Sequence, residues 1–290
     1  MPPDTIKRTM AEVIADREKR KSPGRTFVEA YMTDGLKASV DFDETITDSL
    51  TSSRRKPRYP TRNMFKVVDL SKSPRSYYWH ETLAPDTDPV IAGADLRPEL
   101  SSRTHKSPIP ELLPTQGWVQ VPEELWDDPE GFESFINYRL IVRLSTQENV
   151  TILNGAEGLL AMPGIVRLPP KKGLTSNILA ACDEVEQMGC TADGLVINPI
   201  DYYKALESGS LMDTLERNGV FIVRTRLVEP GTAVVGDFGH GAQLFDAGRS
   251  VMRFAEPPPG KFAQPGIAIM AEIYVRVVVN LPFTFYLVDV

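Results

Sequence analysis

The sequence predicts an α+β fold in which one long helix lies beside an elongated β-sheet. From Pro129, apolar residues recur at helical spacing over about 17 residues, which corresponds to a helix of about 25 Å. Near the other end of the chain, residues 267–279 alternate between two faces without a break. At roughly 3.4 Å per residue this strand would span about 44 Å, which is long for a compact enzyme.

The long helix has a clear start in the sequence. Asp128 is a favourable N-cap residue, and Pro129 follows at the first helical position, where its missing N–H costs nothing. Its apolar stripe consists of Phe132, Phe135, Ile136, Leu140 and Leu144. Shorter elements are predicted beyond Asn154-Gly155: helices at 176–188 and 199–207, and strands at 194–197, 220–225, 233–238, 242–245 and 250–254.

The first third of the chain cannot build a core of its own. Residues 6–20 predict a short amphipathic helix, which ends at Pro23-Gly24 and must bury its apolar stripe on its own domain or on another chain. Nine prolines between 57 and 114 exclude long helices there and leave strand-like pieces at 64–69, 77–83 and 117–121. The aromatic cluster of Tyr77, Tyr78 and Trp79 argues against disorder and favours an extended hairpin that reaches another subunit.

A basic strip interrupts an otherwise acidic chain. The net charge is -7, yet residues 54–66 carry six cations and no acid. Such a strip can contact phosphates or an acidic neighbour, or simply be solvated. Its cations are Arg54, Arg55, Lys56, Arg58, Arg62 and Lys66.

The residues that carry chemistry give no enzyme signature. None of the three histidines has a metal-binding spacing, and no GxSxG motif occurs. The glycine-rich residues 236–241 lack the GKS/T ending of a phosphate loop and precede a predicted strand, so they are assigned to a hairpin turn. We therefore expect no catalytic residue, no cofactor and no metal.

The cysteines and the apolar runs suggest where the chain is made. Cys182 and Cys190 form no CxxC pair and are expected to be reduced thiols. The charged N-terminus does not resemble a signal peptide, and no run approaches the roughly 18 apolar residues of a membrane span. Synthesis in a reducing cytoplasm, without a membrane partner, is the expectation.

The order of these elements resembles that of a known family. Residues 118–155 contain a strand, an acidic turn at 124–128, a long helix and a Leu-Asn-Gly turn, and so resemble the body of tailed-phage major capsid proteins of the Hong-Kong-ninety-seven fold family. Residues 232–238 are similar to the family's Gly-Asp-Phe strand, and residues 261–286 to its closing strand. Residues 92–100 resemble the tip of its extended E-loop.

The resemblance implies a division of the chain. Residues 1–63 would be an N-terminal arm and 64–117 the E-loop. Residues 118–155 and 236–290 would be the peripheral P-domain with its long spine helix and long strands, and 156–235 the axial A-domain. It also implies pentamers and hexamers that close an icosahedral shell around double-stranded DNA, a location in the virion after assembly in the host cytoplasm, and scaffold, portal and decoration proteins as further candidate partners.

Two departures from the family change what is expected. Some members cross-link through a Lys–Asn isopeptide bond promoted by a Glu, to which Glu272 is similar by its place in the last strand. The position of the Asn is occupied by Pro265, which has no side-chain carbonyl, so no cross-link by this route is expected and Glu272 becomes an interface or sheet-face residue. The helix at 6–20 is too short to be the scaffolding domain of some relatives, so scaffolding is expected to come from a separate protein or to be unnecessary.

The candidate contact residues for neighbours or DNA are Arg54, Arg55, Lys56, Arg58, Tyr77, Tyr78, Trp79 and Glu272. Three alternatives stay open: an encapsulin, which is a nanocompartment shell of the same fold; a soluble α/β enzyme with an unrecognised site; and another virion protein such as a decoration protein. The contents of the particle separate the first from a phage capsid, and particle size separates the second.

Overall fold

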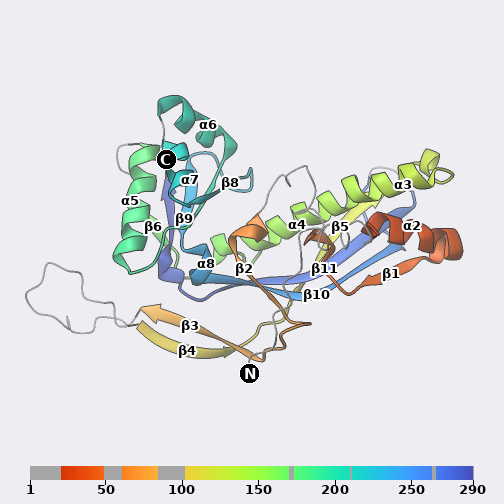
Figure 1. Cartoon of the computed structure of the whole chain (residues 1–290), viewed down its shortest axis with the longest axis horizontal. Coiled ribbons are helices and arrows are strands. Elements are labelled where there is room, and N and C mark those ends of the chain that lie inside the picture. Colours follow the sequence, from red (N-terminus) through yellow and green to blue (C-terminus); the bar gives the residue numbers. More distant parts are fainter. Residues whose placement is uncertain are drawn as a thin grey trace, which may run out of the picture.

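The computed structural model describes residues 21–48, 61–83, 102–169, 173–209, 211–262 and 266–289. They form two five-stranded sheets and a two-stranded hairpin (Figure 1). The main sheet has the strand order β1-β10-β11-β5, and β2 pairs in parallel with the first half of β10. Its strands are β1 (Ser39–Phe42), β2 (Lys66–Asp69), β5 (Leu113–Gln120), β10 (Ala242–Ala255) and β11 (Ala268–Val279).

The elongated final strand is confirmed as β11, which runs antiparallel between β10 and β5. Its partner β10 replaces the two separate strands predicted at 242–245 and 250–254. A bulge between Asp246 and Ser250 interrupts the alternation of side chains there, and this explains why the pattern indicated two strands.

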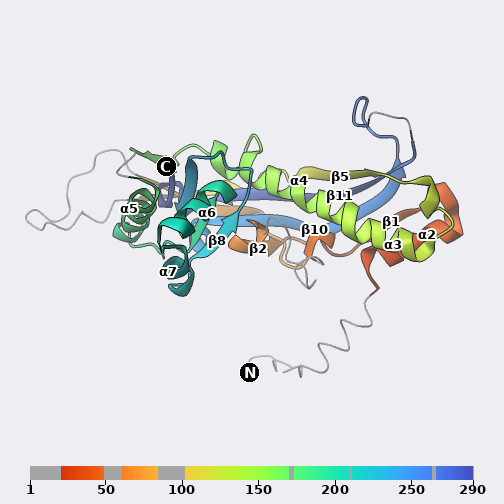
Figure 2. The ribbon, with the colours of Figure 1, turned by 90° about the horizontal axis from the view of Figure 1, so that it is seen from above.

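The long helix is confirmed and extends further than predicted, to Asn154. It consists of α3 (Pro129–Phe135), a π-helical turn (Ile136–Leu140) and α4 (Ile141–Asn154), and it lies along the main sheet (Figures 1 and 2). Asp128 caps it as expected, because its carboxylate accepts the N–H of Gly131 at 3.0 Å.

The π turn follows from the spacing of the buried residues. Phe132, Ile136, Leu140 and Leu144 recur at intervals of four and are almost completely buried. In an α-helix of 3.6 residues per turn, each step of four overshoots one turn by about 40°, so three steps would rotate Phe132 about 120° away from Leu144. The π turn contains more residues per turn than an α-helix, and this offsets the rotation of the stripe. Within the π turn, the Ile141 N–H donates to the Ile136 carbonyl. The π turn thereby keeps the stripe aligned over the sheet.

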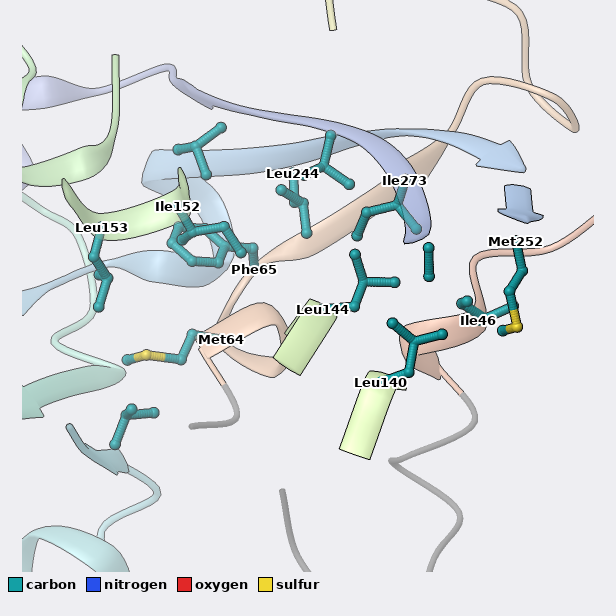
Figure 3. Packing of buried hydrophobic residues seen from close by; sticks show 14 of the residues in the cluster. Ile46, Met64, Phe65, Leu140, Leu144, Ile152, Leu153, Leu244, Met252 and Ile273 are labelled. Atoms are coloured by element: carbon teal, nitrogen blue, oxygen red, sulfur yellow. The ribbon is translucent and has the colours of Figure 1, made fainter. Parts of the chain in front are cut away.

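The main core lies between this helix and the sheet. Figure 3 shows Leu144 beside Ile273 of β11, and Leu140 facing Ile46 and Met252. Ile152, further along the helix, lies next to Phe65. Six of these side chains are at most 1% exposed: Ile46, Leu140, Leu144, Ile152, Met252 and Ile273. The helix is therefore fixed to the sheet along its length.

The second sheet has the order β6-β12-β9-β7-β8 and its own core. The strand predicted at 194–197 and the helices predicted at 176–188 and 199–207 are confirmed, whereas helix α7 was not predicted. The last strand, β12, lies in the residues assigned by sequence to the P-domain, but it pairs with β9 in this sheet. Its elements are β6 (Val166–Leu168), α5 (Leu174–Gln187), β7 (Gly194–Ile197), α6 (Pro199–Ser208), α7 (Leu211–Arg217), β8 (Phe221–Arg224), β9 (Thr232–Gly236) and β12 (Phe285–Asp289).

A helix begins at Pro23-Gly24, where the sequence predicts only the end of a preceding helix. Pro23 occupies the first turn of α2 (Pro23–Asp34), whose N-cap is Ser22. Phe27 of α2 is completely buried, so α2 and β1 belong to the main core. The helix predicted at 6–20 lies outside the described residues.

The glycine-rich residues 236–241 do not form the predicted hairpin turn. They contain the short helix α8 (Phe238–Gly241), which carries the chain from β9 in one sheet to β10 in the other. Its N–H groups are already bonded, because Asp193 accepts those of Phe238 and Gly239 at 2.6 and 2.9 Å. Further short helices are Gly35–Lys37, Thr61–Met64, Glu123–Leu125, Leu159–Ala161 and Pro282–Thr284, and a helical turn lies at 46–48.

Candidate assembly surfaces

The predicted extended hairpin is confirmed by two antiparallel strands, β3 (Tyr77–Leu83) and β4 (Ser102–Pro108). Figure 1 shows it on the side of the main sheet opposite the long helix. Because side chains alternate along a strand, Tyr77 and Trp79 share one face and Tyr78 lies on the other.

The outer face of the hairpin is an exposed aromatic surface with a cation beside it. Tyr77 is 42% and Trp79 is 54% exposed, and their rings meet edge to face at 6.1 Å. The Lys106 ammonium lies 3.8 Å from the centre of the Tyr77 ring. Aromatic residues of this kind, rigid and only partly buried, are typical of protein interfaces.

Tyr78 has a different role from its two neighbours. It packs against Phe245 of β10, with ring centroids 6.3 Å apart, in a small apolar cluster with Val68 and Val278. The Glu81 N–H also donates to the Asn280 carbonyl at 2.7 Å. These contacts fix the base of the hairpin to the main sheet, and the face with Tyr77 and Trp79 points away from it.

Glu272 lies on the face of β11 that the long helix does not cover. It is 9% exposed and accepts hydrogen bonds from the Gln116 amide and the Tyr274 hydroxyl. The bond to Glu272 raises the pKa of Tyr274. Within a single subunit this carboxylate is therefore already satisfied, while Pro265 lies outside the described residues.

Arg62 belongs to the basic strip in the sequence but is buried in the structure. It is 6% exposed, and its guanidinium binds three carboxylates. It contacts Glu148 of the long helix at 2.5 Å and Asp48 at 2.7 Å, and it also bonds to Asp246 at the bulge of β10. The sequence does not show which cation of a basic run is paired inside the fold, because the three partners of Arg62 come from other segments of the chain.

The electrostatics of this cluster are strongly coupled. Burial raises the pKa of Glu148, and the Arg62 guanidinium opposes that rise. Burial disfavours the charge on Arg62, but the three carboxylates outweigh it and raise the pKa of Arg62 above its ordinary value. The cluster joins the long helix to the sheet by charge as well as by packing.

Arg54, Arg55, Lys56 and Arg58 lie outside the described residues, whereas Lys66, the last cation of the strip, is exposed at the start of β2. The residues on either side of these four cations are placed, however. The Asp48–Arg62 ion pair and a hydrogen bond from Thr61 to Asn149 hold both flanks beside the long helix. The hairpin lies on the opposite side of the sheet.

Within the described ranges, no group of three or more His, Cys, Asp or Glu residues could hold a metal, and no described helix is long and apolar enough to cross a bilayer. Cys182 and Cys190 are free thiols, and burial raises the pKa of Cys182 to about 11, so this thiol is protonated at neutral pH.

Comparisons with known proteins address the fold. No model of a known protein family matches the chain. The major capsid protein of Enterobacteria phage HK97 is 24% identical over 239 residues, which are 74% of this chain and 60% of that protein. The chain thus spans about three fifths of the length of this curated relative.

Two solved structures share the architecture. The virus-like particle from Pyrococcus furiosus matches with a TM-score of 0.54 and 11% identity, over 83% of this chain and 95% of the other. Gordonia phage Cozz matches with a TM-score of 0.51 and 13% identity, over 100% of this chain and 97% of the other. The chain has the HK97 capsid fold. The HK97 fold confirms the predicted α+β class and the resemblance, and the proteins that share it are structural capsid proteins rather than enzymes.

Proposed function

We propose that this chain is the major capsid protein of a tailed bacteriophage, and that it assembles as pentamers and hexamers into an icosahedral shell around double-stranded DNA. The observation that carries the proposal is the HK97 fold over essentially the whole chain, together with the sequence similarity to the HK97 major capsid protein. Assembly in the host cytoplasm, and scaffold, portal and decoration proteins as partners, belong to the same proposal.

In this proposal the elements take the roles that the family implies. Residues 118–155 and 236–290 form the P-domain around the long helix, and residues 156–235 the A-domain around the second sheet. The hairpin β3–β4 belongs to the E-loop. The packing of α2 and β1 adds residues 23–42 to the P-domain core, although the arm was expected to extend to residue 63. Likewise, β12 adds a strand to the A-domain sheet.

The placement of the residues that flank Arg54, Arg55, Lys56 and Arg58 supports DNA as the partner of these four cations. The flanking residues are held on the helix side of the main sheet, whereas the aromatic hairpin lies on the other side. A shell subunit needs one surface for its neighbours and one for its contents. We assign the hairpin side to neighbours and the residues Arg54, Arg55, Lys56 and Arg58 to phosphate contacts.

The test is to express the chain in a bacterial host, alone and with the scaffold and portal proteins of the same genome, and to examine purified particles by negative-stain microscopy. Closed icosahedral shells built of this chain are expected in at least one of the two preparations. A chain that stays a monomer or a small oligomer in both would overturn the proposal and would favour the soluble-enzyme alternative.

A shell of the same fold around a protein cargo is the second candidate function. The similarity to the virus-like particle from Pyrococcus furiosus favours it. The contents of particles recovered from the native source decide between the two. Long double-stranded DNA supports the phage capsid, and a packaged enzyme supports the nanocompartment.

Trp79→Ala is expected to abolish or strongly slow shell assembly while leaving the subunit folded. The indole is more than half exposed in the single subunit, so its loss costs the subunit little. At an interface the same truncation typically costs about 2 kcal/mol or more. Trp79→Phe keeps a ring on this face and should assemble, as measured by light scattering and microscopy. Normal assembly of Trp79→Ala would exclude this face as a main contact.

Mature particles are expected to dissociate to monomers in denaturing electrophoresis. Pro265 stands where the cross-linking relatives carry Asn, so a lysine amine has no side-chain carbonyl to attack. The measurement is a gel of boiled particles, with purified unassembled subunits as the control. A ladder of covalent multimers in the particles alone would show that another acceptor exists.

A further inference from the structure

The start of helix α2 is bonded to the π turn of the long helix. The Asn137 side chain, inside the π turn, accepts the Gly24 N–H at 3.0 Å and donates to the Ser22 hydroxyl at 3.0 Å. The Ser22 hydroxyl in turn donates to the Glu133 carboxylate at 2.6 Å and accepts the Arg25 N–H as the N-cap of α2. We call Ser22, Gly24, Glu133 and Asn137 the α2 clamp.

Gly24 makes the closeness of the two helices possible. A Cβ atom at this position would lie 2.7 Å from the Glu133 carbonyl oxygen and 2.8 Å from the Asn137 Oδ1. One of these atoms belongs to the backbone of the long helix and cannot move by rotating a side chain. Only glycine therefore allows α2 to dock directly on the π turn.

The π turn gives the long helix an alternative register. A π turn holds residues beyond those of an α-helical turn, and π-helical hydrogen bonding is rare because it is less favourable. If the π turn becomes α-helical, its one extra residue adds to the helix, and the helical residues before the turn rotate by about 100° and shift by about 1.5 Å. The residues after it, from Ile141 onward, can stay in place.

The segment that would rotate ends in an aromatic cluster and an acidic tip. Phe132 packs against Tyr31 of α2 at 5.6 Å and against Trp126 at 5.7 Å, measured between ring centroids. Because Tyr31 also belongs to α2, this helix contacts the long helix at Phe132 as well as at the π turn. Exposed acids lie next to this cluster, at Glu123, Glu124, Asp127 and Glu130.

We propose that the α2 clamp is a conformational device that sets the register of the long helix. With α2 docked, Asn137 and Phe132 hold the π turn. With α2 displaced, the turn reverts to α-helix and reorients the acidic tip at residues 123–130. Its use rests on the proposed function, because one subunit that meets slightly different neighbours in a closed shell needs a contact surface with more than one orientation.

The experiment measures hydrogen exchange of the unassembled wild-type subunit and of two variants, Asn137→Ala and Gly24→Ala. Asn137→Ala removes two hydrogen bonds and adds no volume, so its hydrogen exchange can be measured even if Gly24→Ala does not fold. Asn154→Ala is the matched control, since it removes one side-chain bond from the same helix, to the Leu227 carbonyl at 3.0 Å, away from the π turn. No shell is needed, so the result is independent of the proposed function.

The clamp predicts a local effect. Amides of residues 132–141 should exchange about tenfold faster in Asn137→Ala, the size expected for the loss of one or two side-chain hydrogen bonds, while residues 145–154 stay unchanged. Asn154→Ala should leave 132–141 at the wild-type rate. The proposal is overturned if the amides of residues 132–141 in Asn137→Ala exchange at the wild-type rate, or if the exchange rate rises uniformly along the whole helix.

Discussion

Replacing Arg62 by Met is expected to destabilise the folded subunit by about 3–5 kcal/mol, because it leaves two buried carboxylates without a counter-charge. Glu148 and Asp246 are each 1% exposed, and the Arg62 guanidinium bonds to both. Thermal unfolding of purified, unassembled subunits measures the change. Such a loss is a large share of the stability of a typical domain, so poor soluble yield is expected too.

Two further variants separate the charge from the packing. Arg62→Met combined with Glu148→Gln should recover part of the loss, because one of the uncompensated charges is gone. Arg167→Met is the matched surface control: its partner is Asp289, both side chains are about a third exposed or more, and the expected cost is at most about 1 kcal/mol. Equal costs for Arg62→Met and Arg167→Met would show that the buried cluster contributes no more than a surface pair.

The Arg62→Met deficit is also expected to depend on pH. Burial raises the pKa of Glu148 in the folded subunit, and removal of Arg62 takes away the charge that opposes this rise. A carboxyl group whose folded pKa is raised destabilises the fold once it ionises, and this penalty disappears as the pH falls through the folded pKa. The stability difference between Arg62→Met and wild type should therefore shrink on acidification. A difference that grows would contradict this assignment.

The sequence predicted the elements whose start, end or type depends only on neighbouring residues. Asp128 and Pro129 marked the start of the long helix, and the alternation in 267–279 identified β11, because capping and strand periodicity depend on neighbouring residues alone. The prolines and aromatic residues predicted an extended hairpin and its first strand at 77–83, but not the partner strand β4. These features were enough to reach the fold class and the family resemblance.

The features that were missed depend on contacts between distant segments. Arg62 looks like its basic neighbours until Glu148 and Asp246 are brought to it. Pro23-Gly24 reads as a helix stop, yet Gly24 is needed for the approach of α2 to the long helix. The π turn is visible in sequence only as a stripe with four-residue spacing, and that spacing was read as ordinary helix. Tertiary packing decided each of these cases.

Gly117→Val is expected to destabilise the subunit by about 3 kcal/mol, since overpacking a close contact between helix and sheet typically costs about 1–3 kcal/mol and occasionally more. A Cβ at Gly117 in β5 would lie 2.8 Å from both the backbone N and the Cα of Leu144. Leu144 is completely buried, in the middle of the long helix. The helix would have to lift from the sheet, and thermal unfolding measures the result.

The control for Gly117→Val is Gly209→Val, because no atom outside its two chain neighbours lies within 4 Å of a Cβ at Gly209, which is exposed. A change within about 0.5 kcal/mol is expected there. Shortening the opposing side chain tests the cause: Gly117→Val with Leu144→Ala should be less stable than Gly117→Val alone. The closest atoms at Leu144 belong to the backbone, so Leu144→Ala opens a cavity without relieving the clash. Recovery in the double variant would mean that side-chain crowding, rather than the backbone contact, sets the distance between helix and sheet.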